Sequence, residues 1–123
     1  MRKTMKTTIL KSIVTAVLVM FFTLPVVSQD KKVTETSFKV FGNCGMCKMR
    51  IENAVKIKHV KFAKWNKETK ILKIAYFSNA ITLDSLQQRI AAVGHDTEKF
   101  KAPDDVYNNL PGCCLYRDGG NTH

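Results

Sequence analysis

The sequence predicts an α+β domain in which two helices cover one face of a four-stranded antiparallel sheet. Three observations predict it: stretches of two-residue alternation, stretches of three- and four-residue spacing, and their order along the chain, β-α-β-β-α-β. This order over about 70 residues is that of the split-βαβ, or ferredoxin-like, sandwich. Because a domain of this size has a small core, we expect modest stability.

The first strand and the first helix are predicted from a change of period near residue 42. Residues 33–41 are expected to form a strand, because Phe38 and Val40 alternate with polar residues and indicate one buried face. A Gly-Asn pair then breaks the strand. Residues 47–58 are expected to form a helix, because apolar residues recur there at three- and four-residue spacing.

A hairpin is predicted next. Residues 60–65 and 72–76 alternate as strands, and the polar residues 66–69 between them are typical of a turn. Val60 is out of phase with the later inward residues of its strand, which predicts a bulge or a late strand start. The two strands are therefore expected to pair with each other.

The second helix has clear start and stop signals. Thr82 is a good N-cap, apolar residues then step by three, four and three, and Gly94 suits the position just after a helix. Residues 96–100 are expected to supply a short fourth strand. From residue 101 the composition becomes rich in Pro, Gly, Asp and Asn, which predicts a tail outside the domain.

The N-terminal segment predicts export. A basic start precedes an apolar run over residues 13–27, and Val-Val-Ser then offers a cleavage site after Ser28. We therefore expect residues 1–28 to be a signal peptide, 29–100 a domain, and 101–123 a tail, in a periplasmic or secreted protein. The alternative is an uncleaved membrane anchor, for which the apolar run is short.

The charge of the chain favours some partners over others. The net charge is +10, and loss of the first 28 residues, which hold four basic and no acidic residues, leaves about +6. Nucleic-acid binding is a poor candidate for an exported chain without a nucleic-acid motif. A basic surface suits solvent, an acidic partner or anionic lipid. We expect a monomer.

Cys44-Gly45-Met46-Cys47 lies between the first predicted strand and helix. Two thiols at a helix N-terminus are stabilised as thiolates by the helix dipole and the free N–H groups. Such a pair binds one soft metal ion or closes into a redox disulfide. A structural disulfide is a further alternative for each pair in an exported chain with four cysteines, although a C-x-x-C bridge closes only a short loop.

Residues 42–55, with C-x-x-C, then an aliphatic residue at Ile51, resemble the heavy-metal-associated domain family. This family includes copper chaperones, the metal-binding modules of copper- and zinc-transporting ATPases, and a periplasmic mercury-binding protein. The resemblance covers residues 34–99 and implies the ferredoxin-like fold, with Cys44 and Cys47 as metal ligands. The chain departs from the family by having Gly42 for Met, His59 for Gly and His95 for Tyr.

The predicted function is to carry, scavenge or transfer a soft metal ion, without enzymatic activity. Cu(I) is expected first, then Hg(II), because both accept two sulfur ligands; Zn(II) and Cd(II) follow, since Zn(II) prefers four. The expected partners are a metal-transporting membrane protein or another metal carrier. The alternative is a thiol-disulfide oxidoreductase, for which this chain lacks the aromatic residue before Cys44 and the later strand-opening Pro.

Three further residues are candidate accessory ligands. His95 follows the second helix at the same end of the fold as Cys44 and Cys47, although a loop histidine without a ligand role is the slightly favoured interpretation. Cys113 and Cys114 lie in the tail, which is long enough to return to the pair. They either join the metal site, form a second thiol site, or bridge to the first pair.

Lys48 and Arg50 either offset the thiolate charge or form a solvated helix face.

Overall fold

The computed structural model describes residues 32–118. The predicted signal peptide lies outside these residues, and its cleavage stays a prediction. Within residues 32–118, no helix is both long enough and apolar enough to span a membrane.

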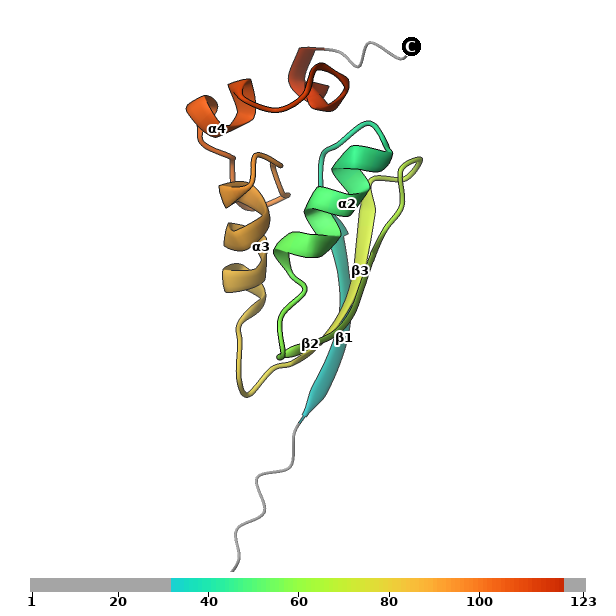
Figure 1. The fold of residues 1–123 in the computed structure, drawn as a ribbon. Helices are drawn as coiled ribbons and strands as arrows, with labels where there is room; N and C mark the ends of the chain where they lie inside the picture. The colour runs from blue at the N-terminus through green and yellow to red at the C-terminus, as the bar shows by residue number, and fades with distance from the viewer. Residues whose placement is uncertain (1–31, 119–123) are drawn as a thin grey trace, which may run out of the picture. The chain divides into compact units, whose positions relative to one another are not determined.

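A three-stranded antiparallel sheet forms the base of the fold (Figure 1). The central strand pairs with both neighbours, and Leu72 lies opposite Phe38 on one side and Trp65 on the other. The predicted irregularity at Val60 is confirmed, because the register shifts between Val60 and Phe62. The strands, in the order in which they lie side by side, are β1 (Val33–Lys39), β3 (Ile71–Phe77) and β2 (Val60–Trp65).

The predicted fourth strand over residues 96–100 is wrong. Only Thr97 forms a bridge, to Val40, with one backbone hydrogen bond on each side. The segment therefore touches the free edge of β1, where a fourth strand would lie. It then curls, because the Thr97 N–H donates to the Phe100 carbonyl at 2.8 Å and the Thr97 Oγ1 accepts from the Phe100 N–H at 2.9 Å. A turn satisfies the backbone groups that a strand would have paired.

Two helices, α2 (Gly45–Ala54) and α3 (Leu83–Ala92), lie on the same face of the sheet (Figure 1). The Thr82 Oγ1 accepts from the Ser85 N–H, as expected for an N-cap. α2 starts earlier than predicted and ends earlier, at Ala54, because Val55 leaves the helical conformation before the chain enters β2. The two helices and the sheet enclose the core.

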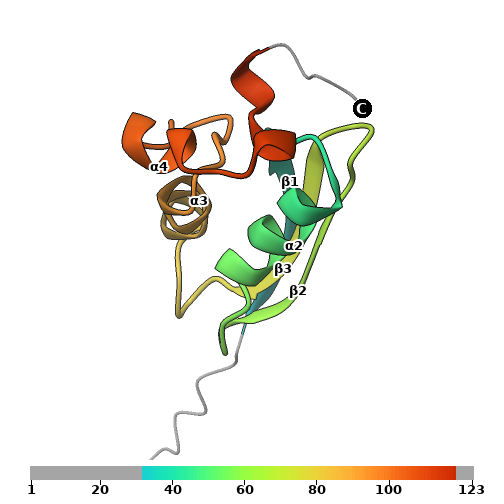
Figure 2. The same ribbon diagram turned by 45° about the horizontal axis from the view of Figure 1, so that its top comes forward.

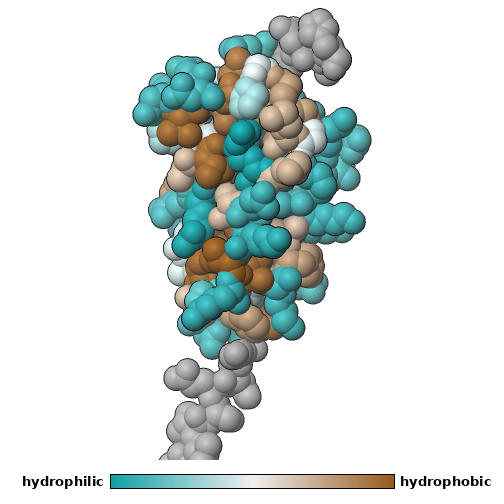
Figure 3. Space-filling view, viewed as in Figure 1, coloured by the Kyte–Doolittle hydropathy of each residue, from teal (hydrophilic) through white to brown (hydrophobic). Residues whose placement is uncertain are grey.

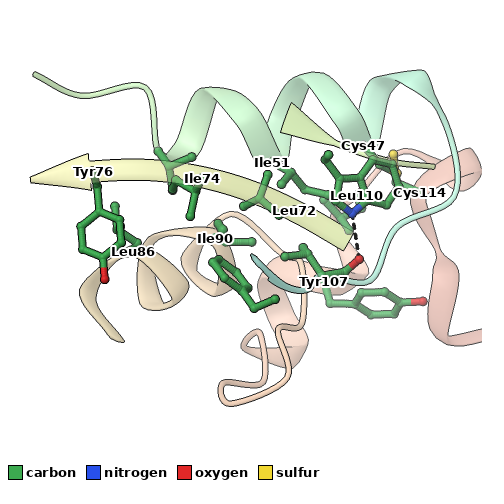
Figure 4. Packing of buried hydrophobic residues seen from close by; sticks show 14 residues of the cluster. Cys47, Ile51, Leu72, Ile74, Tyr76, Leu86, Ile90, Tyr107, Leu110 and Cys114 are labelled. Atoms are coloured by element: carbon green, nitrogen blue, oxygen red, sulfur yellow. Dashed lines mark hydrogen bonds between the residues drawn. The ribbon is translucent and has the colours of Figure 1, made fainter. Parts of the chain in front are cut away.

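Apolar side chains from every layer meet between the helices and the sheet (Figure 4). Trp65 is buried there, and its Nε1–H donates to the Val40 carbonyl at 2.9 Å, which joins β2 to the end of β1. The other buried members are Phe38, Val40, Cys47, Ile51, Val55, Leu72, Ile74, Tyr76, Leu86, Ile90, Tyr107, Leu110 and Cys114.

The last three members of this core come from residues 104–118, which pack against the two-layer body. They form α4 (Asp104–Asn108) and two 3-10 turns, η1 (Gly112–Cys114) and η2 (Tyr116–Asp118). Figure 2 shows α4 near the end of α3 and the 3-10 turn η1 beside the start of α2. The described part of the tail is therefore an ordered layer over one end of the helices.

Gly94 is the position at which the tail meets α3. Its φ of +106° is a conformation that glycine adopts at little cost. A Cβ built there would come within 2.9 Å of Leu110 Cδ2. The missing side chain therefore ends the helix and also leaves room for Leu110.

Two tail side chains hold the turn Gly94–Asp96. The Tyr116 hydroxyl donates to the Gly94 carbonyl at 2.8 Å and accepts from the Asp96 N–H at 2.7 Å. Arg117 donates to both oxygens of Asp96, from Nη2 at 2.7 Å and Nε at 3.0 Å. Its guanidinium also lies over the Tyr107 ring, 4.1 Å from the centroid. We call this set of contacts the tail clasp.

The surface of the described domain is mixed in character. On the face shown in Figure 3, hydrophobic patches are separated by hydrophilic side chains. Two of the exposed large hydrophobic residues, Met46 and Met49, belong to α2. They lie on the same helix as Cys47.

We predict that Asp96→Asn lowers the free energy of unfolding by about 2 kcal/mol, because the Arg117 pair is charge-assisted and partly buried. Urea unfolding followed by Trp65 fluorescence measures this. The matched control is Asp84→Asn, which removes an exposed pair with Lys99 and should cost less than about 1 kcal/mol. Equal effects of the two variants would contradict the prediction.

The effect of Asp96→Asn should depend on pH. Burial opposes ionisation of Asp96, but hydrogen bonds from Arg117 and the Ala102 N–H outweigh it and lower its pKa. A carboxyl whose pKa is lowered by folding stabilises the fold above its unfolded pKa and loses that contribution as pH falls through the folded pKa. The difference between the variant and the wild type should therefore disappear in acid.

Candidate metal centre

Cys44 and Cys47 are placed by the first turn of α2. Cys44 is the N-cap residue, in an extended conformation with φ −134° and ψ 176°, and Cys47 lies one turn inside the helix. Their sulfurs are 3.4 Å apart. Cys47 is fully buried, whereas Cys44 is partly exposed. One sulfur is thus fixed by packing and the other faces outward.

The loop before the helix passes close to the core. A Cβ at Gly42 would lie 3.0 Å from Cys47 Cβ and 3.1 Å from the Trp65 ring. A larger residue there would push against both side chains. The absence of a side chain at Gly42 therefore leaves room for Cys47 and Trp65.

The tail brings two more sulfurs to the same place. Cys44 Sγ lies 3.3 Å from Cys113 Sγ and 3.5 Å from Cys114 Sγ, and the two tail sulfurs are 3.9 Å apart. The sulfurs of Cys44, Cys47 and Cys114 all lie within 4.8 Å of one another. Figure 4 shows Cys47 and Cys114 at the same end of the core. All four cysteines are free thiols.

Basic side chains of α2 divide between the two roles that the sequence left open. The Arg50 Nη1 donates to Cys114 Sγ at 3.6 Å, so its charge is directed at the thiol cluster. Lys48 instead pairs with Glu52 and donates to the Trp65 carbonyl at 2.8 Å. Arg50 therefore directs a positive charge at the thiols, and Lys48 links α2 to β2.

The thiols differ in acidity. Burial opposes ionisation of Cys44, but the Cys47 N–H and hydrogen bonds from the other three thiols lower its pKa to about 7. Burial, together with hydrogen bonds to Cys47 and Cys44, raises the pKa of Cys114 well above its ordinary value. The hydrogen bond to Cys44 raises the pKa of Cys113. Cys44 is therefore partly ionised at neutral pH, whereas Cys113 and Cys114 stay protonated there.

His95 is buried at the same end of the fold but is not part of the sulfur cluster. Its Nδ1–H donates to the Phe41 carbonyl at 2.8 Å, and its ring stacks on Tyr116. Neither ring nitrogen joins the group of ligand atoms that lie within 4.8 Å of one another. Burial lowers its pKa, so the ring is neutral at neutral pH. Its Nε2 has no hydrogen-bond partner among the described residues.

Two features of the site were missed by sequence reasoning. The Cys113 Sγ lies 3.7 Å from the Met46 Sδ, so a thioether adjoins the cluster. The position of Met46 inside the C-x-x-C motif is a signal for this contact. The residues of the tail clasp have no local signal, because Tyr116 and Arg117 act through a turn about 20 residues earlier in the chain.

We predict that limited alkylation of the reduced, metal-free protein at pH 7 modifies Cys44 before Cys113, although Cys113 is more exposed. The thiolate is the reactive form, and the rate at Cys44 should rise with pH to half its maximum at about pH 7. Peptide mass spectrometry after iodoacetamide treatment measures the order. Cys113→Ala, which removes a hydrogen bond that lowers the pKa of Cys44, should move that midpoint upward. Faster reaction of Cys113 would contradict this assignment.

Comparison with solved structures finds metal-binding domains of similar fold. A CopZ metallochaperone is 26% identical, with 52% of this chain and 98% of that chain covered at a TM-score of 0.50. The N-terminal domain of a potential copper-translocating P-type ATPase from Bacillus subtilis, in the Cu(I)-loaded state, is 22% identical, with 54% and 85% covered and a TM-score of 0.51.

The N-terminal soluble domains of Bacillus subtilis CopA are 24% identical, with 54% of this chain and 46% of that chain covered at a TM-score of 0.50. No protein-family model matches the chain, and no curated protein matches it. The matches thus cover about half of this chain. In its fold, the chain resembles the copper chaperones of the heavy-metal-associated domain family, which confirms the resemblance that residues 42–55 predict.

Proposed function

We propose that this protein is an exported carrier or scavenger of a soft metal ion, with Cu(I) as the preferred ion and Hg(II), Zn(II) or Cd(II) as further candidates. The observation that carries the proposal is the pair of sulfurs, Cys44 and Cys47, 3.4 Å apart at the start of α2. The fold supports it, because a CopZ metallochaperone has a similar one. The ion is the cargo of the protein and not a resident cofactor.

The two thiols are suited to different parts of metal exchange. Cys47 is held in the core and provides a fixed ligand, whereas Cys44 is partly exposed and ionised near neutral pH. An incoming thiolate of a partner reaches Cys44 first and replaces it in the coordination of a two-coordinate ion. The partner is a metal-transporting membrane protein or another metal carrier. The protein acts as a monomer and catalyses no reaction.

The rival function, thiol-disulfide exchange, has less support from the described residues. A thioredoxin-like motif belongs to a different βαβ setting, in which a later Pro opens a strand. Both prolines within residues 32–118, Pro103 and Pro111, lie in the tail and precede helical segments. The fold matches cited above are metal-binding domains.

We predict that Cys44→Ser/Cys47→Ser abolishes tight Cu(I) binding, because both thiolates of the pair are lost. Competition with a Cu(I) chelator under anaerobic conditions measures affinity and stoichiometry, and circular dichroism checks that the fold is retained. The matched control, Ser78→Ala, changes an exposed hydroxyl outside the site. Unchanged Cu(I) binding by the double variant would refute the proposal, and reduction of insulin at thioredoxin-like rates by the wild type would favour the redox function.

We predict that export removes residues 1–28 and leaves Gln29 as the first residue, because a basic start and an apolar run precede the Val-Val-Ser site. Intact-mass measurement on protein from the periplasm or the medium tests this. Ser28→Phe should slow cleavage, since the site requires a small residue. Recovery of the full-length chain from membranes alone would contradict cleavage.

A further inference from the structure

The tail is held so that its two cysteines face the first pair. The clasp of Tyr116 and Arg117 on Asp96 fixes the chain just after Cys114, and Leu110 against Gly94 fixes it just before η1. Between these anchors, the Cys114 N–H donates to the Pro111 carbonyl at 2.8 Å and closes the 3-10 turn. Cys114 is fully buried. The position of its sulfur is therefore set on both sides by contacts that involve no cysteine.

The distances between the sulfurs match tetrahedral coordination by four sulfurs better than linear coordination by two. With a metal–sulfur bond of about 2.3 Å, two sulfurs on opposite sides of an ion lie about 4.6 Å apart, and the edges of a tetrahedron of four sulfurs are about 3.8 Å long. The distances from Cys44 to Cys47, Cys113 and Cys114 are 3.4, 3.3 and 3.5 Å, and the Cys113–Cys114 distance is 3.9 Å. These four distances lie near the tetrahedral edge. The sulfurs of Cys44, Cys47 and Cys114 already lie within 4.8 Å of one another, and Cys113, which is outside that group, has to move toward Cys47 to complete the tetrahedron.

The charge balance also fits a doubly charged ion. One divalent ion bound by four thiolates gives the site a net charge of −2, and the thiol protons are released to the buffer. Arg50 donates to Cys114 Sγ and offsets part of this charge. A single C-x-x-C pair satisfies a two-coordinate ion, but it leaves half of a tetrahedral ion's coordination empty.

We propose that the docked tail adds Cys113 and Cys114 to the pair Cys44 and Cys47, giving one four-thiolate site that binds a tetrahedral divalent d10 ion, Zn(II) or Cd(II). The inference rests on the proposed function, because it uses the same pair. It goes beyond that function by assigning two further ligands and the class of ion that needs them. The tail clasp then acts as the positioning device of the site, and its release opens half of the coordination sphere.

The test loads the reduced full chain with one equivalent of Zn(II) and measures the number of sulfur neighbours by X-ray absorption, together with affinity by chelator competition. The wild type should show four sulfurs. Cys113→Ser/Cys114→Ser should show two and bind Zn(II) at least about a hundredfold more weakly. Two sulfurs in the wild type, or unchanged Zn(II) binding by the variant, would overturn the proposal.

A second variant tests the role of the clasp without removing a thiol. Arg117→Met keeps all four cysteines but removes the contact with Asp96, and should weaken Zn(II) binding at least about tenfold. The matched control, Lys99→Met, removes an exposed pair with Asp84, takes no part in the clasp and should leave binding unchanged. Equal affinities of the two variants would overturn the positioning role.

Cu(I) binding separates this inference from the proposed function. Cys113→Ser/Cys114→Ser should retain one tightly bound Cu(I) at the remaining pair, even though its Zn(II) binding falls. If the variant keeps both ions as tightly as the wild type, the four-thiolate site is wrong and the function stands. If Cys44→Ser/Cys47→Ser also keeps tight Cu(I) binding, the proposed function itself fails.

Discussion

The turn Gly94–Asp96 is the constraint on which the rest of the structure depends. Gly94 ends α3 with a positive φ, the His95 Nδ1–H donates to the Phe41 carbonyl, and the Asp96 carbonyl accepts from the Phe41 N–H at 2.9 Å. The same three residues receive Tyr116 and Arg117 from the tail. One short turn therefore connects the second helix, the end of the first strand and the tail. Because a buried backbone group must be paired, these bonds fix the turn in one arrangement.

The position of this turn explains how a small domain gains a larger cluster of thiols. A sandwich of about 70 residues buries a small core and exposes the helix start that bears the C-x-x-C pair. Here the tail adds Tyr107, Leu110 and Cys114 to that core. The packing of the tail against the core therefore also brings its thiols to the first cysteine pair. The free energy that orders the tail comes from apolar contacts and the Asp96 ion pair, and the sulfurs are placed as a consequence.

The likeness to solved structures covers about half of the chain. Cys44 and Cys47 suit the handing over of a two-coordinate ion, since one of the two sulfurs is partly exposed. Cys114 is buried and Cys113 is exposed, so the added thiols enclose one side of the site and leave the other accessible.

The sequence by itself determined most of the local elements and the position of the first cysteine pair. Alternation around Phe38, the N-cap Thr82 and the spacing of Cys44 and Cys47 are local signals, because each depends on neighbours within about one or two helical turns. Only the tertiary structure decided that residues 96–100 turn instead of forming a strand, and that Cys114 meets Cys44 across 70 positions of sequence. Those outcomes follow from the pairing of Tyr116 and Arg117 with a distant turn, and neither periodicity nor composition encodes which distant groups a tyrosine hydroxyl and a guanidinium will contact.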